Sequence, residues 1–87
     1  MQYHFEFHDW ERAFELFYRR RQRDDSLVLV ISTAPEVSGY WIEPGEGAAS
    51  NKETKVYRTI GEVQRLEQRV RRARAKMVNL SLGGVVI

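Results

Sequence analysis

The stretch LVLVIST, residues 27–33, decides how this chain folds. It is apolar on both faces and rich in β-branched side chains, the composition of a strand that is covered on both sides. Turn-forming residues follow at Ala34-Pro35 and Ser38-Gly39, and residues 40–42, YWI, have the character of a returning strand. The segment therefore predicts a β-hairpin at the centre of a small sheet.

Before this hairpin, the sequence predicts a strand followed by a helix. Residues 3–8, YHFEFH, alternate apolar and polar side chains, the pattern of a half-buried strand. Asp9 is a suitable N-cap, because its carboxylate can accept the free N–H groups of a first turn. The apolar stripe of a surface helix comes next, formed by Trp10, Ala13, Phe14, Phe17 and Tyr18. The predicted helix ends in RRRQRDD, residues 19–25, where cations suit the helix dipole.

After the hairpin, residues 44–51 predict a loop, and residues 55–58 a short strand or an extension of the hairpin. Thr59 and Glu62 form a capping box, which predicts a second helix that runs to about Asn79. A final apolar strand is expected from Leu80 to Ile87. The order β-α-β-β-(β)-α-β predicts one α+β domain over residues 1–87, with both helices on one face of the sheet, in a ferredoxin-like arrangement or a close variant.

Length and composition exclude several classes of protein. The chain has 87 residues, of which 43% are hydrophobic and 30% charged, as expected for a single globular domain rather than a disordered segment. It has no cysteine, which excludes disulfides and thiolate metal sites. The N-terminal residues lack the basic and apolar regions of a secretory signal, and the longest apolar run, residues 27–31, is far too short for a membrane span. We therefore expect a cytoplasmic protein that does not bind membranes.

The stretch HFEFH, residues 4–8, contains both histidines and is the candidate for a metal or catalytic site. On a strand the two histidines would lie about 13 Å apart, too far to share one tetrahedral ion with Glu6. No further histidine or cysteine could complete a site, and no nucleophile elbow accompanies a histidine base. We expect His4, Glu6 and His8 to form the polar side of a strand. The prediction is therefore no enzyme, no catalytic residue, no cofactor and no metal, with a histidine-based or metal-dependent hydrolase as a distant alternative.

The second predicted helix carries a row of cations that we call the arginine ridge: Arg65, Arg69, Arg72 and Lys76. These four side chains lie within roughly 60° of one another around the helix, and only Glu62 is near enough to neutralise them. Glu67 is instead placed for Arg71 and Arg74. An unpaired cationic row destabilises its own helix slightly and matches a phosphate backbone or an acidic protein surface.

Two observations weaken a purely functional interpretation of these cations. Arginine makes up 11 of the 14 basic residues, so the ridge is also explained as a solvated face of an arginine-rich protein. The helix dipole alone also explains a second basic cluster at the end of the first helix. This cluster consists of Arg19, Arg20, Arg21 and Arg23.

The apolar side of the second helix is narrow. Its residues follow a 3-4-3-4 spacing: Val63, Leu66, Val70, Ala73 and Met77. Two interpretations remain open. Either the helix lies at the edge of the sheet beside the first helix, or its seam docks against a second copy of the chain.

The sheet also predicts a protein interface. Val28 and Val30 point away from Leu27, Leu29 and Ile31, so the two valines and an aromatic residue of the next strand would lie on a face that the helices leave uncovered. Trp41 is a further candidate interface residue, and the sequence leaves open which face of the sheet it occupies. The last strand, with Val85 and Ile87, would offer an edge for β-augmentation. A homodimer through the sheet face, the sheet edge or the helix seam is the expected assembly.

Together these patterns predict a small non-enzymatic regulatory or accessory module. It would contact an anionic partner through the arginine ridge, with the second basic cluster Arg19, Arg20, Arg21 and Arg23 as further binding residues. The nucleic-acid backbone is favoured over an acidic protein surface, without base-specific readout. The alternative is a protein-interaction module, such as an adaptor or a small inhibitor of the phage or mobile-element type, that acts through a sheet edge or face.

Overall fold

The central hairpin forms as expected in the computed structural model, which describes residues 2–3 and 9–86, and side chains for residues 9–76. β2 (Leu27–Ala34) and β3 (Val37–Pro44) pair antiparallel along their whole length, with Leu27 opposite Pro44 and Ala34 opposite Val37. The β-branched run therefore becomes the strand at the middle of the sheet.

Two further strands flank the hairpin. β4 (Thr54–Tyr57) pairs antiparallel with β2, so β3, β2 and β4 form the body of the sheet. The two-residue β1 (Gln2–Tyr3) adds to the outer side of β3 and gives the order β1-β3-β2-β4. The predicted short strand at residues 55–58 is thus confirmed as a separate strand, displaced by one residue.

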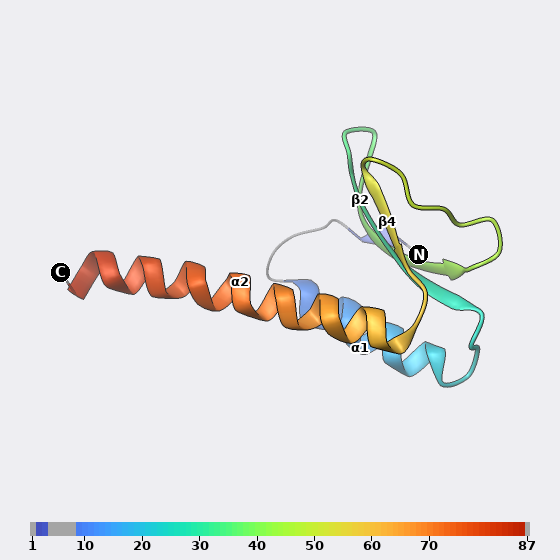
Figure 1. The fold of residues 1–87 in the computed structure, drawn as a ribbon, viewed down its shortest axis with the longest axis horizontal. Helices are drawn as coiled ribbons and strands as arrows, with labels where there is room; N and C mark the ends of the chain where they lie inside the picture. The colour runs from blue at the N-terminus through green and yellow to red at the C-terminus, as the bar shows by residue number, and fades with distance from the viewer. Residues whose placement is uncertain (1, 4–8, 87) are drawn as a thin grey trace.

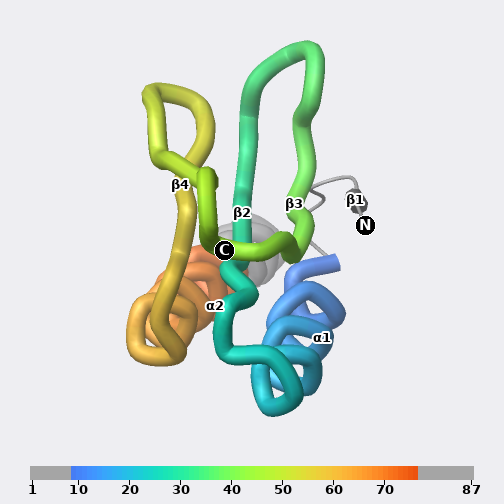
Figure 2. The backbone as a smooth tube through the Cα atoms, turned by 90° about the vertical axis from the view of Figure 1, so that its right-hand side faces the viewer, coloured from blue at the N-terminus to red at the C-terminus, as the bar shows by residue number. Residues whose placement is uncertain are grey.

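Both helices lie on the same face of this sheet (Figure 2). α1 (Trp10–Arg21) and α2 (Ile60–Val86) run antiparallel, since Arg21 contacts Arg58 just before α2 while Trp10 lies beneath Arg71. Asp9 is the N-cap of α1, as expected, although its carboxylate makes no capping hydrogen bond. The capping box of α2 is confirmed: the Glu62 N–H donates to Thr59 Oγ1 over 3.0 Å.

The core divides into two clusters on the two faces of the sheet. The larger cluster joins both helices to the strands and contains Trp10, Phe14, Phe17, Leu29, Ile42, Val63 and Leu66. The smaller one, on the opposite face, contains Val28, Val30 and Val56, with Trp41 and Ala48 packed against it. Because β2 lies between β3 and β4, the chain at residues 45–53 has to cross β2, and Ala48 covers the valines from this crossing segment.

The predicted final strand at Leu80–Ile87 is wrong, because α2 continues as a helix to Val86. Continuing a helix adds one hydrogen bond per residue, whereas a new strand needs a turn and a free sheet edge. The outer edge of β4 is already bonded to its own loop: Ser50 Oγ accepts from the Val56 N–H, and the Asn51 N–H donates to the Thr54 carbonyl oxygen. With no strand after α2 in the described chain, a ferredoxin-like topology is not confirmed, and the fold is a small α+β domain.

α2 makes the molecule elongated. Its 27 residues span about 40 Å, and its C-terminal half extends beyond the sheet and α1 (Figure 1). The principal extents are 51 × 29 × 18 Å, and the radius of gyration is 14.6 Å. A compact chain of this length would have a radius of gyration of about 12 Å. The first turns of α2 are therefore packed on the domain, while the side chains of residues 71–76 are exposed.

Candidate functional site

The apolar seam of α2 divides into a packed part and an exposed part. Val63 is fully buried and Leu66 is buried, both in the core shared with α1. Val70 is half-buried and Ala73 is exposed. Val63, Leu66 and Val70 thus follow the interpretation in which α2 lies beside α1, and Ala73 is the first exposed position of the seam. Met77, the last predicted seam residue, lies outside the described side chains.

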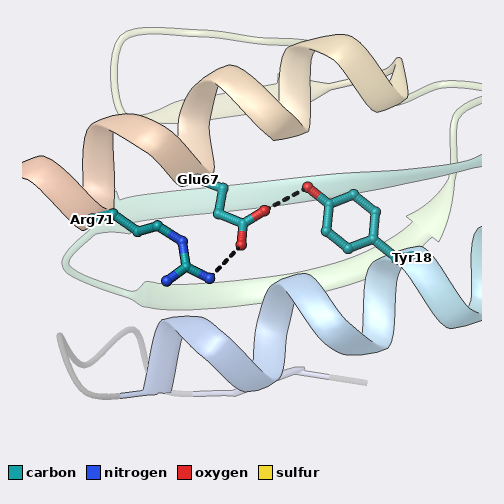
Figure 3. Close-up of polar contacts among 3 residues, drawn as sticks. All are labelled: Tyr18, Glu67 and Arg71. Carbon is teal, nitrogen blue, oxygen red and sulfur yellow. Dashed lines mark hydrogen bonds and ion pairs between the residues drawn. The ribbon is translucent and has the colours of Figure 1, made fainter.

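Three side chains of α2 form a flank that faces α1: Glu67, Arg71 and Arg74. The Tyr18 hydroxyl donates to Glu67 Oε1 over 2.8 Å, and Arg71 Nη2 donates to Glu67 Oε2 over 2.9 Å (Figure 3). The Arg71 guanidinium also lies 4.7 Å from the centroid of the Trp10 ring. The Tyr18 hydroxyl and the Trp10 ring of α1 therefore hold this flank in place.

This network includes both a confirmed pairing and features that the sequence did not reveal. The predicted ion pair between Glu67 and Arg71 is confirmed. Arg74, for which the same carboxylate was expected, instead lies 5.7 Å from the centroid of Trp10. Burial and the neighbouring Glu67 carboxylate raise the pKa of the Tyr18 hydroxyl. The i, i+4 spacing predicts the ion pair, whereas the contacts that Tyr18 and Trp10 make with α2 depend on how the two helices cross.

The arginine ridge lies on the flank of α2 turned away from α1. At about 100° per residue, its centre is roughly 160° around the helix from the Arg71/Arg74 pair. All four ridge side chains are exposed. Within the part of the chain whose side chains are described, none of the four makes an ion pair or a side-chain hydrogen bond. The nearest acid, Glu62, accepts from the Thr59 hydroxyl over 3.3 Å.

The four arginines of the second basic cluster make different contacts. Arg19 pairs with Glu15 over 2.9 Å. Arg21 Nη1 donates to the carbonyl oxygens of Leu27 and Arg58 over 3.0 and 2.7 Å, so its guanidinium is already engaged by the backbone. Only the exposed Arg20 and Arg23 have no side-chain partner among the described residues. The cluster lies at the end of α1, whereas the arginine ridge lies on the side of α2 that is turned away from α1.

The residues predicted to form a protein interface are placed differently from the expectation. Val28 and Val30 do lie on the face opposite the helices, but only 3% and 1% of their surface is exposed. Trp41 is half-buried on the same face, where it packs against them. Val85 belongs to α2 rather than to an edge strand, and Ile87 lies outside the described residues. The expected sheet edge for a partner strand is therefore absent.

No metal site can be built from the described residues, among which no three His, Cys, Asp or Glu side chains gather. His4, Glu6 and His8 lie outside this part of the chain. A hollow of about 460 Å³ on the outer side of α1 has acids and arginines mixed along its wall, including Glu11, Glu15 and Arg19. Opposite charges in one lining favour neither a cation nor an anion.

Comparison with models of known protein families, with curated proteins and with solved structures found no match. Among the described residues, neither helix combines the length and the apolarity needed to cross a bilayer.

Proposed function

We propose that this protein is a small non-enzymatic module that binds an anionic partner, the nucleic-acid backbone, through the arginine ridge Arg65, Arg69, Arg72 and Lys76. One observation supports this proposal above all others. The four cations are exposed and lack a partner in the described part of the chain, while the neighbouring Arg71 is ion-paired and stacked. A helix that pairs a cation with a carboxylate on one flank and leaves four cations without a described partner on the other has a surface suited to an external anion.

The energetics favour an external anion on this flank. Like charges at i, i+3 and i, i+4 destabilise a helix by about 0.2–0.5 kcal/mol per pair, and phosphates placed along the row would remove that cost. The ridge spans about 16 Å along the helix axis, a length over which one strand of a duplex presents about five phosphates. Three of the four cations are arginines, whose planar fork binds phosphate oxygens in pairs.

The alternative, a protein-interaction module that acts through the sheet, has less support. The edge strand that this alternative needs was predicted at residues 80–87, where α2 continues to Val86 instead. Val28 and Val30 are buried within the single chain. Trp41 is the one predicted contact with a described side chain that retains exposed surface on that face. A homodimer through parallel α2 helices would place two cationic ridges near one another, and like charges disfavour that arrangement.

The test is fluorescence anisotropy with labelled oligonucleotides at about 50 and 200 mM salt. Four phosphate contacts predict a logarithmic salt slope near −3.6, or roughly a hundredfold loss of affinity between these conditions. The double variant Arg69→Glu/Arg72→Glu should abolish binding while circular dichroism shows an unchanged fold, because both side chains are exposed.

A matched control separates the ridge from net charge. Lys52→Glu/Lys55→Glu also reverses two exposed cations and takes the net charge from +2 to −2, as the ridge variant does. We expect this control to retain most of the binding. Absence of binding at the lower salt concentration, or equal loss in both variants, would contradict the proposal.

A further inference from the structure

We infer that the outward side of α2 lies in the major groove of a B-form DNA duplex, an inference that rests on the proposed function and narrows its ligand. The observation behind it is an uncharged strip between the two cationic flanks of the helix. The strip consists of Gln64, Gln68 and Ala75, all of them exposed.

The positions around the helix place this strip between two sets of cations. It lies roughly 70° from the Arg71/Arg74 pair and roughly 90° from the centre of the arginine ridge, so the two cationic flanks are on opposite sides of it. Val63 and Leu66, which point into the core, lie on the far side of the helix from the strip. The strip is thus the side of α2 that faces directly away from the domain.

Two opposed cationic flanks match the two sugar-phosphate walls of a groove. The B-DNA major groove is about 12 Å wide and admits an α-helix of about 10–12 Å diameter. On the ridge flank the cations have no described partner. On the other flank, Arg71 keeps 56% of its side chain exposed in spite of its contacts with Glu67 and Trp10. Both walls would therefore meet accessible guanidinium groups.

The strip between the flanks suits the floor of such a groove. Base edges offer hydrogen-bond donors and acceptors there, and a glutamine amide can pair with N6 and N7 of adenine. Gln68 is at the centre of the strip, and Ala75 is small enough for close approach. The strip is exposed and lies on the opposite side of α2 from the buried Val63 and Leu66, so the core does not cover it.

Other nucleic acids fit this surface less well. The major groove of A-form RNA is deep and narrow, so the helix would reach only its outer phosphates. Single strands are bound by stacking on aromatic side chains, and residues 60–76 include no aromatic residue. The arrangement consequently favours duplex DNA over both.

The experiment compares a DNA duplex, an RNA duplex of the same sequence and single-stranded DNA by anisotropy at about 50 mM salt. We expect the DNA duplex to bind at least about tenfold more tightly than the other two. Bound protein should protect guanine N7, in the major groove, from methylation by dimethyl sulfate, and leave adenine N3, in the minor groove, reactive. Gln68→Glu should weaken duplex binding about tenfold, and Gln22→Glu, with the same charge change at the end of α1, should have little effect.

The outcomes distinguish this inference from the proposed function. Equal binding of all three nucleic acids, with loss in the Arg69→Glu/Arg72→Glu variant and no N7 protection, would overturn the groove inference and leave the arginine ridge as the binding surface. Absence of binding to every oligonucleotide would overturn both. Binding to vesicles with anionic headgroups but not to oligonucleotides would also overturn both and would identify a lipid surface as the partner.

Discussion

At Gly45 the chain leaves β3 and passes so close to the start of β2 that a side chain has no space. A Cβ atom there would lie 2.9 Å from Val28 Cγ1 and 3.1 Å from the Ser26 carbonyl oxygen. The Gly45 N–H donates to that same carbonyl over 2.7 Å, and Arg58 Nη1 donates to the Gly45 carbonyl oxygen over 3.0 Å. This residue holds the crossing segment over the smaller core cluster.

The first prediction compares two glycines. Gly45→Ala should lower the free energy of unfolding by about 2 kcal/mol, because the added methyl group overpacks against Val28 and the backbone of Ser26. Gly61→Ala, where the nearest atom is 3.9 Å away in the first turn of α2, should raise it by about 0.5 kcal/mol. Urea titration measures both, and a similar destabilisation in the two variants would contradict the packing at Gly45.

Tyr18 gives a prediction about pH. Burial and Glu67 raise the pKa of its hydroxyl, so the folded chain holds this proton more tightly than the unfolded chain does. Its contribution to stability is complete below the unfolded pKa of about 10 and is lost as the pH rises toward the higher folded value. We expect Tyr18→Phe to be less stable than the wild type by about 1 kcal/mol at neutral pH. That difference should shrink above about pH 10, and a constant difference in urea titrations at both pH values would be inconsistent with the Glu67 contact.

At the scale of the elements, Arg21 joins the end of α1 to both neighbouring segments. It donates to the backbone of Leu27 at the start of β2 and of Arg58 before α2, and its guanidinium lies 5.8 Å from the centroid of Phe17. The helix dipole alone would explain a cation at this position, but Arg21 also connects α1 to the start of β2 and to the segment before α2. Arg23, two residues later, is exposed without a side-chain partner among the described residues.

The matched pair Arg21→Lys and Arg23→Lys tests this bridge. Both variants keep the charge near the end of α1, so the dipole interaction is preserved. Arg21→Lys should cost about 1–2 kcal/mol, because one ammonium group cannot reproduce the two backbone contacts and the stacking. Arg23→Lys should stay within about 0.5 kcal/mol of the wild type. Equal thermal unfolding midpoints for the two variants would show that Arg21 does not bridge the elements.

At the scale of the whole molecule, the folded domain and the projecting helix are separable. The buried residues of the larger cluster lie between Trp10 and Leu66, with Val70 packed at its margin. The described contacts between α1 and α2 end at Arg74. The elongated shape therefore arises from a helix that continues after its packing partner has ended.

Truncation after Lys76 tests this separation. The shortened chain should unfold cooperatively at a midpoint within a few degrees of the full chain, because the end of α2 projects past the sheet and α1 (Figure 1). It should also keep its salt-dependent oligonucleotide binding, since it retains the arginine ridge. Thermal scans at several protein concentrations provide the control. A midpoint that rises with concentration only in the full chain would mean that a second copy packs on the removed segment.

The sequence by itself determined the hairpin, the extent of α1 and the start of α2. Alternation, the 3-4 apolar spacing and the Thr59/Glu62 capping box are local signals, and they remain valid in any tertiary context. The exposed cationic ridge followed from the same helical periodicity. Local pattern was also sufficient for the ion pair between Glu67 and Arg71, since the i, i+4 spacing brings these side chains together in any helix.

Only the tertiary structure decided that residues 80–86 are helical, that Val28 and Val30 are buried, and that Arg21 contacts the backbone of two other segments. An apolar segment near glycines suits a strand or a helix, and the choice depends on whether a sheet edge is free to receive it. Burial on the second sheet face depends on where the crossing segment lies, which no periodicity encodes. Arg21 became structural because folding brought the carbonyl groups of Leu27 and Arg58 within reach of its guanidinium. Local periodicity sets the direction of a side chain, and the partners it meets are set by how the elements pack.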